Sequence, residues 1–432
     1  MHRILMVRFS PQHNAVYPII AVSSPKARSK TLKVEYMCRQ YFLCRKKQVN
    51  YTDSYKALTN ILKLKTEARE FCLPHLQVSI SLFNFASDYS SLNMQLNQES
   101  KFITPFPHID EDQVPENMNF DYPVIQPTGS QYFDRAIILL HGLNERSWNK
   151  YLPWAYRLAI RLQRPIILFP ISFHMNRSPS EWSNPRLMSA LLGNTRLKNH
   201  RNHSATFANL ALSLRLTHKP ERFFTSGSQS LKDILKLTDL LKTGNHPLFN
   251  KGCKIDFFAY SIGAFLSQIM MLTYGDNTLK DSKLFLFCGG APFNRMNGVS
   301  KLIMDEEAFI RLKFYYLKKI EREIKNRGPM AEYICTQPWG QAFRAMIGSS
   351  NFFQWREDSF KRLGSRIYAI GMVKDKVIPA SYMSELLAPE QMEIIDFPYY
   401  YTHENPFPLQ ANPKLVNEAF DTIIGKAISF LA

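Results

Sequence analysis

This 432-residue chain has few cysteines and no long apolar stretch, and both scarcities narrow what it can be. Its six cysteines form no CxxC pair and no regular framework, so we expect no disulfide-stabilised scaffold. Such cysteine usage favours a reducing, cytoplasmic compartment. No apolar run approaches the roughly 18 residues of a membrane-spanning helix, so we expect no transmembrane span.

Several ligand-binding signatures are missing as well. The sequence has no P-loop, no GxGxxG after a strand and no HExxH. His200 and His203, each preceded by an asparagine, are typical of a polar loop rather than of a metal site. We therefore expect neither a metal nor another cofactor.

Positive charge is plentiful and uneven. The formal net charge is +18, and residues 1–50 contribute half of it, with ten Lys and Arg residues against one acid, Glu35. This basic, irregular extension has three interpretations: an arm that binds an anionic polymer, a solvated tail, or a stretch upstream of a later start at Met37 or Met94. Because no basic cluster is interleaved with aromatic residues, we expect no nucleic-acid binding.

The remaining chain divides near residue 120. Residues 51–119 are expected to form a helical segment (53–70, capped by Asp53) followed by a Pro-rich, acidic linker. From 120 to 432, apolar runs alternate with helical patterns such as 151–162, 264–273 and 413–431, which is typical of a three-layer α/β fold. Most runs are continuous rather than alternating, which favours a mostly parallel sheet that is buried on both faces. The predicted strands are 122–125, 136–140, 165–169, 255–260, 284–288, 366–370 and 392–396.

Two gaps between predicted strands, 171–254 and 289–365, are too long for simple connections. Both leave from the carboxyl ends of strands, where ligand sites form, so we interpret them as cap insertions that roof a pocket. The second contains a predicted helix from about Glu306 to Asn326, capped by Asp305. Its expected apolar face consists of Ile310, Phe314, Leu317 and Ile324. Its basic residues fit a solvated face as well as a functional one.

Three residues occur in the order nucleophile, acid, base. Ser261 lies in Ala259-Tyr260-Ser261-Ile262-Gly263, directly after an apolar strand, and the small residues on either side allow a tight strand–turn–helix elbow. Asp375 follows the predicted strand 366–370, and His403, the only histidine after His246, precedes the last helix. A serine hydroxyl needs a base to take its proton and a carboxylate to orient that base, and these residues supply both. Asp396 is a rival carboxylate, at the end of the strand that leads to His403.

A further motif precedes the elbow, in Ile138-Leu139-Leu140-His141-Gly142-Leu143. An oxyanion requires two backbone N–H donors, and we expect them from Ile262 and from Leu143 or Asn144. His141 is expected to brace this loop. The candidates for substrate binding are Arg146, Arg177 and Trp182, with either arginine suited to an anionic group. An internal salt bridge, for instance of Arg146 with Glu181, is the alternative.

Together these motifs resemble the α/β-hydrolase superfamily over roughly residues 120–432, and the runs 140–148 and 169–177 are similar to a bacterial branch of unassigned function. The resemblance implies a serine hydrolase with a Ser-His-Asp triad that cleaves a small-molecule ester, thioester or amide through an acyl-enzyme. Among these activities, the resemblance favours an esterase or lipase over a peptidase or an acyltransferase. Ala259, where the family usually has glycine, and the large insertions depart from the common pattern and leave the substrate open.

Two other hypotheses remain open at this point. One is a non-catalytic ligand-binding protein with the α/β-hydrolase fold. The other is a binder of anionic polymers that works through residues 1–50. No oligomeric state is implied by any of the three.

Overall fold

The computed structural model describes residues 49–59, 61, 69–88, 114–198 and 203–432. Residues 1–48, which hold nearly all of the predicted basic extension, lie outside this part of the chain. So do residues 89–113, which include most of the predicted linker at 100–120.

A nine-stranded sheet forms the centre of the described chain, with strand order β1-β2-β3-β5-β4-β6-β7-β8-β9. β1, β2, β3 and β5 pair antiparallel in that succession, and all pairs from β5 through β4 to β9 are parallel. The strands are β1 (Glu70–Leu73), β2 (Val78–Ala86), β3 (Asn119–Pro127), β4 (Phe133–Leu140), β5 (Ile166–Leu168), β6 (Phe249–Tyr260), β7 (Leu284–Phe287), β8 (Ile367–Met372) and β9 (Met392–Ile395).

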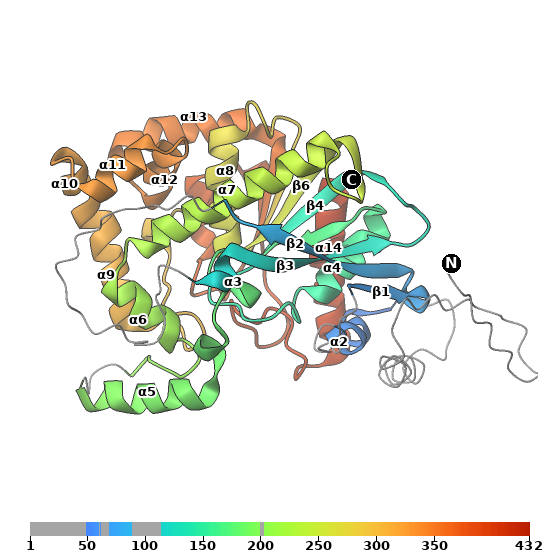
Figure 1. Ribbon diagram of the computed structural model, residues 1–432, viewed down its shortest axis with the longest axis horizontal. Helices are drawn as coiled ribbons and strands as arrows, with labels where there is room; N and C mark the ends of the chain where they lie inside the picture. The colour runs from blue at the N-terminus through green and yellow to red at the C-terminus, as the bar shows by residue number, and fades with distance from the viewer. Residues whose placement is uncertain (1–48, 60, 62–68, 89–113, 199–202) are drawn as a thin grey trace, which may run out of the picture.

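Two hydrophobic cores lie on opposite faces of the sheet. In β4, Ile138 and Leu140 belong to one core, whereas Ile137 and Leu139 belong to the other, as the two-residue period of a strand requires. Helices α7 (Arg222–Thr243) and α8 (Ile262–Tyr274) cover the first face, and α4 (Leu152–Leu162) and α14 (Pro413–Leu431) cover the second (Figure 1). Burial on both faces explains why the strands are continuous apolar runs.

The predicted three-layer α/β architecture is confirmed, and each of the seven predicted strands is present. The predicted final helix is confirmed too: Pro413 stands in its first turn, and the Asn412 side chain accepts the N–H of Lys414 over 3.0 Å. The mostly parallel sheet, its antiparallel edge and the elbow after β6 give the chain the α/β-hydrolase fold.

The expected start of the main domain near residue 120 is corrected by the sheet. β1 and β2 lie within 51–119, yet β2 pairs with β3 along its whole length, from Val78 opposite Pro127 to Ala86 opposite Asn119. The predicted helix 53–70 is also too long, because α2 (Tyr51–Thr59) is followed by β1 from Glu70 on. The N-cap of α2 is Asn50 rather than Asp53, because the Asn50 side chain accepts the N–H of Asp53.

The first predicted insertion is smaller than expected. Helix α7 lies within residues 171–254, but it packs against β6 and so belongs to a layer that covers the sheet. The helices α5 (Pro185–Lys198) and α6 (Leu210–His218) lie outside that layer, and α6 packs against α9 (Glu306–Phe314) of the second insertion (Figure 1). In the second insertion, α12 (Gly340–Ile347) and α13 (Phe353–Leu363) pack against α8.

The helix predicted over Glu306–Asn326 is present with its predicted cap, but its predicted apolar face is only partly correct, since Leu317 and Ile324 are half-buried against the core. Asp305 accepts the Ala308 N–H over 2.9 Å, and α9 continues through a π-helical turn (Tyr315–Lys319) into α10 (Ile320–Lys325). Ile310 and Phe314 are 58% and 61% exposed. The buried positions are instead Phe309, Leu312 and Tyr316, which lie on the side of the helix that packs against the core.

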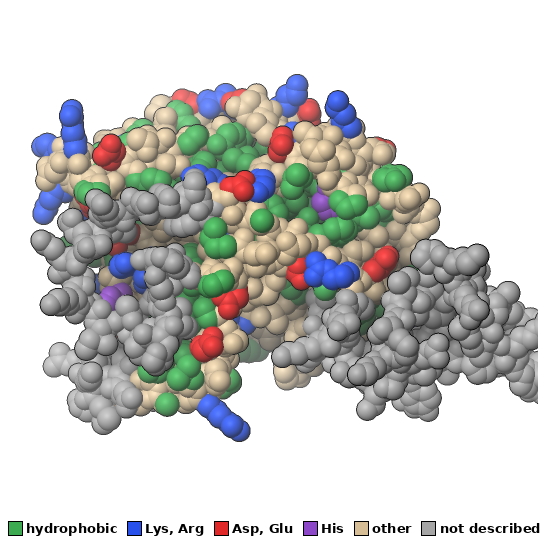
Figure 2. Space-filling view, in the orientation of Figure 1, with side chains coloured by type: hydrophobic (Ala, Val, Ile, Leu, Met, Phe, Trp, Pro, Cys, Tyr) green, Lys and Arg blue, Asp and Glu red, His purple; other side chains and the backbone are tan. Residues whose placement is uncertain are grey.

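The surface around the second insertion is rich in cations. In the view of Figure 2, Lys and Arg side chains lie along the upper and left edges, over α10, α11 (Pro329–Thr336) and α13, with acidic side chains between them. Within the described residues, no helix is both long and apolar enough to cross a membrane. The cysteines in this part, Cys72, Cys253, Cys288 and Cys335, are free thiols.

Candidate active site

Ser261 lies at the sharp turn between β6 and α8 and has a strained backbone. β6 ends at Tyr260 and α8 begins at Ile262, so one residue joins them. Ser261 has φ 57° and ψ −119°, a conformation that costs a non-glycine residue about 1–3 kcal/mol. Such strain persists where the surrounding structure enforces it, most often at functional sites. The turn is the strand–turn–helix elbow that the sequence predicted.

The small residues around Ser261 let the elbow approach β4. A Cβ atom on Gly263 would lie 2.8 Å from the carbonyl oxygens of both Leu140 and His141. The N–H of Gly263 donates to the His141 carbonyl over 3.2 Å. Ala259 is fully buried opposite Leu140, so the sheet accommodates alanine where the family usually has glycine.

The structure brings Ser261, His403 and Asp375 into hydrogen-bonding contact. Ser261 Oγ lies 2.6 Å from His403 Nε2, and His403 Nδ1 lies 2.7 Å from Asp375 Oδ2. Because a carboxylate only accepts, Nδ1 carries the imidazole proton and Nε2 is left to accept the serine proton. All three residues are at most 4% exposed. The arrangement can therefore deprotonate Ser261.

Asp375, and not its rival Asp396, reaches the histidine. The second oxygen of Asp375 accepts the N–H groups of Val377 and Ile378, each over 2.9 Å, which fixes the carboxylate. Asp396 instead accepts the Tyr401 hydroxyl over 2.7 Å and pairs with Lys374 at 3.1 Å.

His141 braces the loop after β4. Its Nδ1 lies 2.8 Å from the Gly142 carbonyl oxygen, and its Nε2 accepts the N–H of Ile171 over 2.9 Å. Burial lowers the pKa of His141 well below its usual range, so the ring is neutral and donates through Nδ1. Both nitrogens are therefore used by backbone groups.

The two expected oxyanion donors lie at one cavity. In the described part of the chain, the N–H groups of Ile262 and Leu143 have no hydrogen-bond acceptor, and both residues line the same cavity. Asn144 has a positive φ of 61°, and its side-chain amide donates to the carbonyls of Ala208 (2.9 Å) and Leu302 (2.7 Å). The Asn144 side chain thus ties both insertions to the loop. Because Leu143 lines the cavity and Asn144 does not, Leu143 is the donor that we retain.

The cavity has a volume of about 60 Å³ and a mainly apolar wall. It lies between the loop after β4, α7, α8 and α12, and its lining includes Leu143, Ile262, Phe223, Phe265, Trp339 and Phe343. His174 also lines it, and burial lowers the pKa of His174 to about 4. Of the described residues that form the wall, none is charged at neutral pH.

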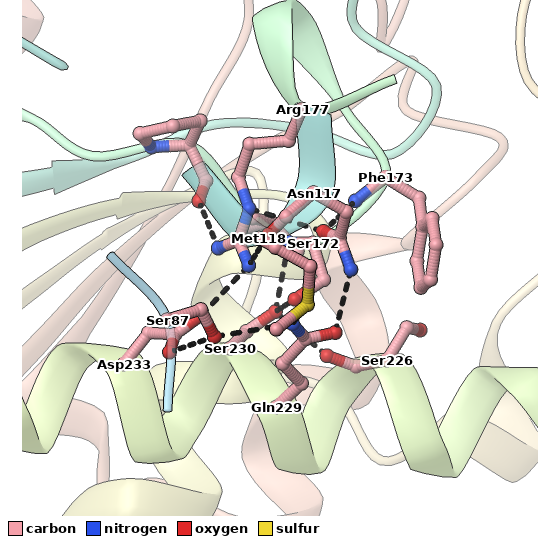
Figure 3. A network of polar contacts seen from close by, with 12 residues as sticks. Ser87, Asn117, Met118, Ser172, Phe173, Arg177, Ser226, Gln229, Ser230 and Asp233 are labelled. Carbon is pink, nitrogen blue, oxygen red and sulfur yellow. Dashed lines mark hydrogen bonds and ion pairs between the residues drawn. The ribbon is translucent and has the colours of Figure 1, made fainter. Parts of the chain in front are cut away.

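Arg177 is not available to a substrate, contrary to the prediction. Its side chain is fully buried and forms an ion pair with Asp233 of α7 at 2.7 Å. It also donates to Asn117 and to the Pro170 carbonyl oxygen. Figure 3 shows Arg177 reaching from the loop after β5 to α7, where Ser87 and Gln229 complete the network. Arg177 therefore fastens the loop 170–177 to the sheet layer.

The other two predicted substrate-binding residues are placed differently. Trp182 is 3% exposed and packs with Met188 and Leu210 in a small satellite core, so it does not line the cavity. The guanidinium of Arg146 donates to the Trp182 carbonyl and the Ser183 hydroxyl rather than to Glu181. Burial lowers the pKa of Arg146 to about 10. Binding of an anionic group by Arg146 stays a prediction.

One group of side chains has the composition of a metal site. Cys288, Asp375 and His403 each offer a ligand atom, and these atoms lie within 4.8 Å of one another. However, Asp375 and His403 are engaged in the hydrogen bonds above, and burial raises the pKa of the Cys288 thiol well above its usual range. A metal would have to displace those bonds and ionise the thiol, so we assign none. His203 is exposed, and His200 lies outside the described residues.

Sequence reasoning missed a second group of residues beside the site. Glu145, Lys150, Tyr151 and Tyr260 connect the loop after β4 with the His403 loop through hydrogen bonds described below. The available signal was the close succession of an acid, a lysine and a tyrosine after His141-Gly142. Sequence alone does not show that their side chains turn inward.

Comparison with known proteins identifies a family without a described activity. One family model, described as "Family of unknown function (DUF6051)", matches residues 49–432. No curated protein matches the chain.

Solved structures with related folds include several esterases. A cold-adapted esterase from an Arctic intertidal metagenomic library is 11% identical, with a TM-score of 0.38 over 85% of this chain and 100% of that one. A variant of the esterase rPPE is 8% identical, with a TM-score of 0.44 over 94% and 97%. A bacterial heroin esterase is 11% identical, with a TM-score of 0.42 over 89% and 94%. Likenesses of this degree identify no substrate.

Proposed function

The chain belongs to the DUF6051 family, whose function is unknown, and we propose that it is a serine hydrolase that cleaves a small ester, thioester or amide. The observation that carries the proposal is the continuous contact from Ser261 Oγ through His403 to Asp375 at a strained elbow. Esterase-like activity on a short acyl group is the form that the cavity favours.

In the proposed first half-reaction, Ser261 Oγ attacks the substrate carbonyl carbon while His403 Nε2 takes the hydroxyl proton. Asp375 holds the Nδ1–H of the ring and stabilises the imidazolium. The N–H groups of Ile262 and Leu143 would stabilise the oxyanion. Collapse of the tetrahedral intermediate breaks the bond to the leaving group, which receives the proton from His403. Ser261 is left acylated.

In the second half-reaction, water attacks the acyl carbon and gives a proton to His403. The bond from the acyl carbon to Ser261 Oγ then breaks, the acid is released, and His403 returns the proton to Ser261 Oγ. The cavity that begins at Leu143 and Ile262 would hold the acyl chain. The cavity is small, with a volume of about 60 Å³. Because the wall is apolar and uncharged, short neutral acyl groups should fit best.

The test is covalent labelling with a fluorophosphonate probe, followed by hydrolysis of p-nitrophenyl esters of increasing chain length. We expect labelling of the wild type, none of Ser261→Ala, and faster hydrolysis of acetate or butyrate than of decanoate esters. A folded wild type that does not label, or a Ser261→Ala variant that still does, would refute the mechanism. A preference for the decanoate ester would refute the assignment of the cavity.

A further inference from the structure

The ammonium group of Lys150 sits between the two loops of the proposed site. It pairs with the carboxylate of Glu145 and donates to the backbone carbonyl of Glu404 over 3.0 Å. It also lies over the rings of Tyr260 and Tyr151, 4.5 and 5.0 Å from their centroids. The Lys150 side chain is only 15% exposed, so these contacts replace most of its hydration.

Glu145 continues the connection to the loop after β4. Besides Lys150, the same oxygen of Glu145 accepts the Tyr151 hydroxyl over 3.1 Å. The Tyr151 hydroxyl in turn accepts the N–H of Gly142 over 2.9 Å. Gly142 directly precedes Leu143, the proposed oxyanion donor. One chain of contacts therefore runs from Gly142 to the residue that follows His403.

The backbone of the His403 loop is held on several sides. The Tyr260 hydroxyl donates to the His403 carbonyl, Lys150 donates to the Glu404 carbonyl, and the Ser300 hydroxyl bonds the Glu404 side chain. Since the Lys150 ammonium also lies over the Tyr260 ring, Lys150 contacts both the loop and the residue that anchors it. Removal of Lys150 would leave the Glu145 carboxylate half-buried without its cation.

We propose that Lys150 and Glu145 act as one positioning pair, which sets the loop of the oxyanion donor and the His403 loop at the separation that catalysis needs. This inference rests on the proposed serine hydrolase function and adds two residues to it. Neither residue would touch the reacting atoms. Misplacement of catalytic groups by about 1 Å costs up to about 100-fold in rate, so the pair should act on rate rather than on binding.

The experiment measures fluorophosphonate labelling of the full chain, with separate values for the limiting rate (kinact) and the half-saturating probe concentration (KI). The variants are Lys150→Met, which keeps the stem, Glu145→Gln, which keeps the shape, and the double variant. We expect each single variant to lower kinact by about 10- to 100-fold with an unchanged KI. We expect the double variant to be no slower than the slower single variant, because the pair works as a unit.

Lys426→Met is the matched control, since Lys426 forms an exposed ion pair with Glu393 at 2.7 Å on the far helix α14. It should label like the wild type. Lys150→Arg, which keeps the charge, should retain more of kinact than Lys150→Met does, and a purely structural role would not separate these two variants once both are folded.

The possible outcomes distinguish a failure of this inference from a failure of the proposed hydrolase function. If the wild type shows no Ser261-dependent labelling, the function and the inference both fall. If the wild type labels but Lys150→Met and Glu145→Gln keep its kinact, the inference alone is overturned. It is also overturned if KI rises while kinact is unchanged, or if the two single losses multiply in the double variant.

Discussion

The hydroxyl of Tyr260 donates a hydrogen bond to the backbone carbonyl of His403, and the two rings stack with centroids 5.6 Å apart at 24°. The residue just before the proposed nucleophile thereby orients the proposed base. Both residues are nearly inaccessible, at 1% and 3% exposure, so water does not replace the bond when it is lost.

Tyr260→Phe should therefore slow fluorophosphonate labelling about tenfold while the protein stays folded. The ring packing remains, but the buried His403 carbonyl loses its donor, which costs about 1–3 kcal/mol in stability. Labelling kinetics and thermal unfolding check both effects. Tyr368→Phe is the control, because the Tyr368 hydroxyl bonds Glu393 at a half-buried position away from the site. Equal labelling rates for Tyr260→Phe and the wild type would contradict the orienting role.

Ser261→Gly should be more stable than Ser261→Ala by about 1 kcal/mol. At φ 57° and ψ −119° a Cβ atom is strained, whereas glycine is not, and this gain exceeds the extra chain entropy that glycine loses. Chemical denaturation of the two variants measures the difference. A glycine variant that is less stable than the alanine variant would show that the elbow stores no strain.

Arg177→Met should lower the free energy of unfolding by about 3–5 kcal/mol, because it leaves Asp233 buried without its cation. Arg362→Met breaks an ion pair with Asp276 whose side chains are 50% and 67% exposed, and it should change stability by about 1 kcal/mol or less. Urea unfolding of both variants tests the contrast. Similar losses in both would refute a structural role for the buried network of Figure 3.

Stability should fall as the pH drops from about 6.5 to 4. Burial lowers the pKa values of His174 and His246 to about 4, whereas in the unfolded chain both titrate near their usual value of 6.5. In that window the unfolded state therefore binds more protons than the folded one, at a loss of up to about 3 kcal/mol per histidine. Above pH 6.5 and below pH 4, these two histidines do not change the free energy of unfolding with pH.

The check is the urea midpoint as a function of pH for the wild type and His246→Gln. Glutamine offers an oxygen to the Leu248 N–H, which His246 Nδ1 accepts over 3.2 Å in the wild type. The variant should show a shallower decline between pH 6.5 and 4. A slope identical to that of the wild type would exclude His246 as a contributor.

The sequence by itself determined the features that depend on local patterns. The seven strands from β3 to β9 could be predicted because strands buried on both faces are continuous apolar runs. The elbow at Ser261 and the cap of α14 depend on residues next to each other, such as Gly263 and Asn412. The chain order of Ser261, Asp375 and His403 placed all three at the carboxyl edge of one sheet, where they do meet.

Only the tertiary structure decided which groups face inward. β1 and β2 were missed because their alternation of polar and apolar residues, as in Val78–Ser81, is weak until β2 pairs with β1 and β3. Arg177 looked like a surface cation because its partner Asp233 lies 56 residues away in the sequence. The buried stripe of α9, the cavity wall and the contacts of Lys150 each join segments distant in the chain. Local sequence patterns do not predict such long-range contacts, because the packing of the layers supplies the free energy that stabilises them.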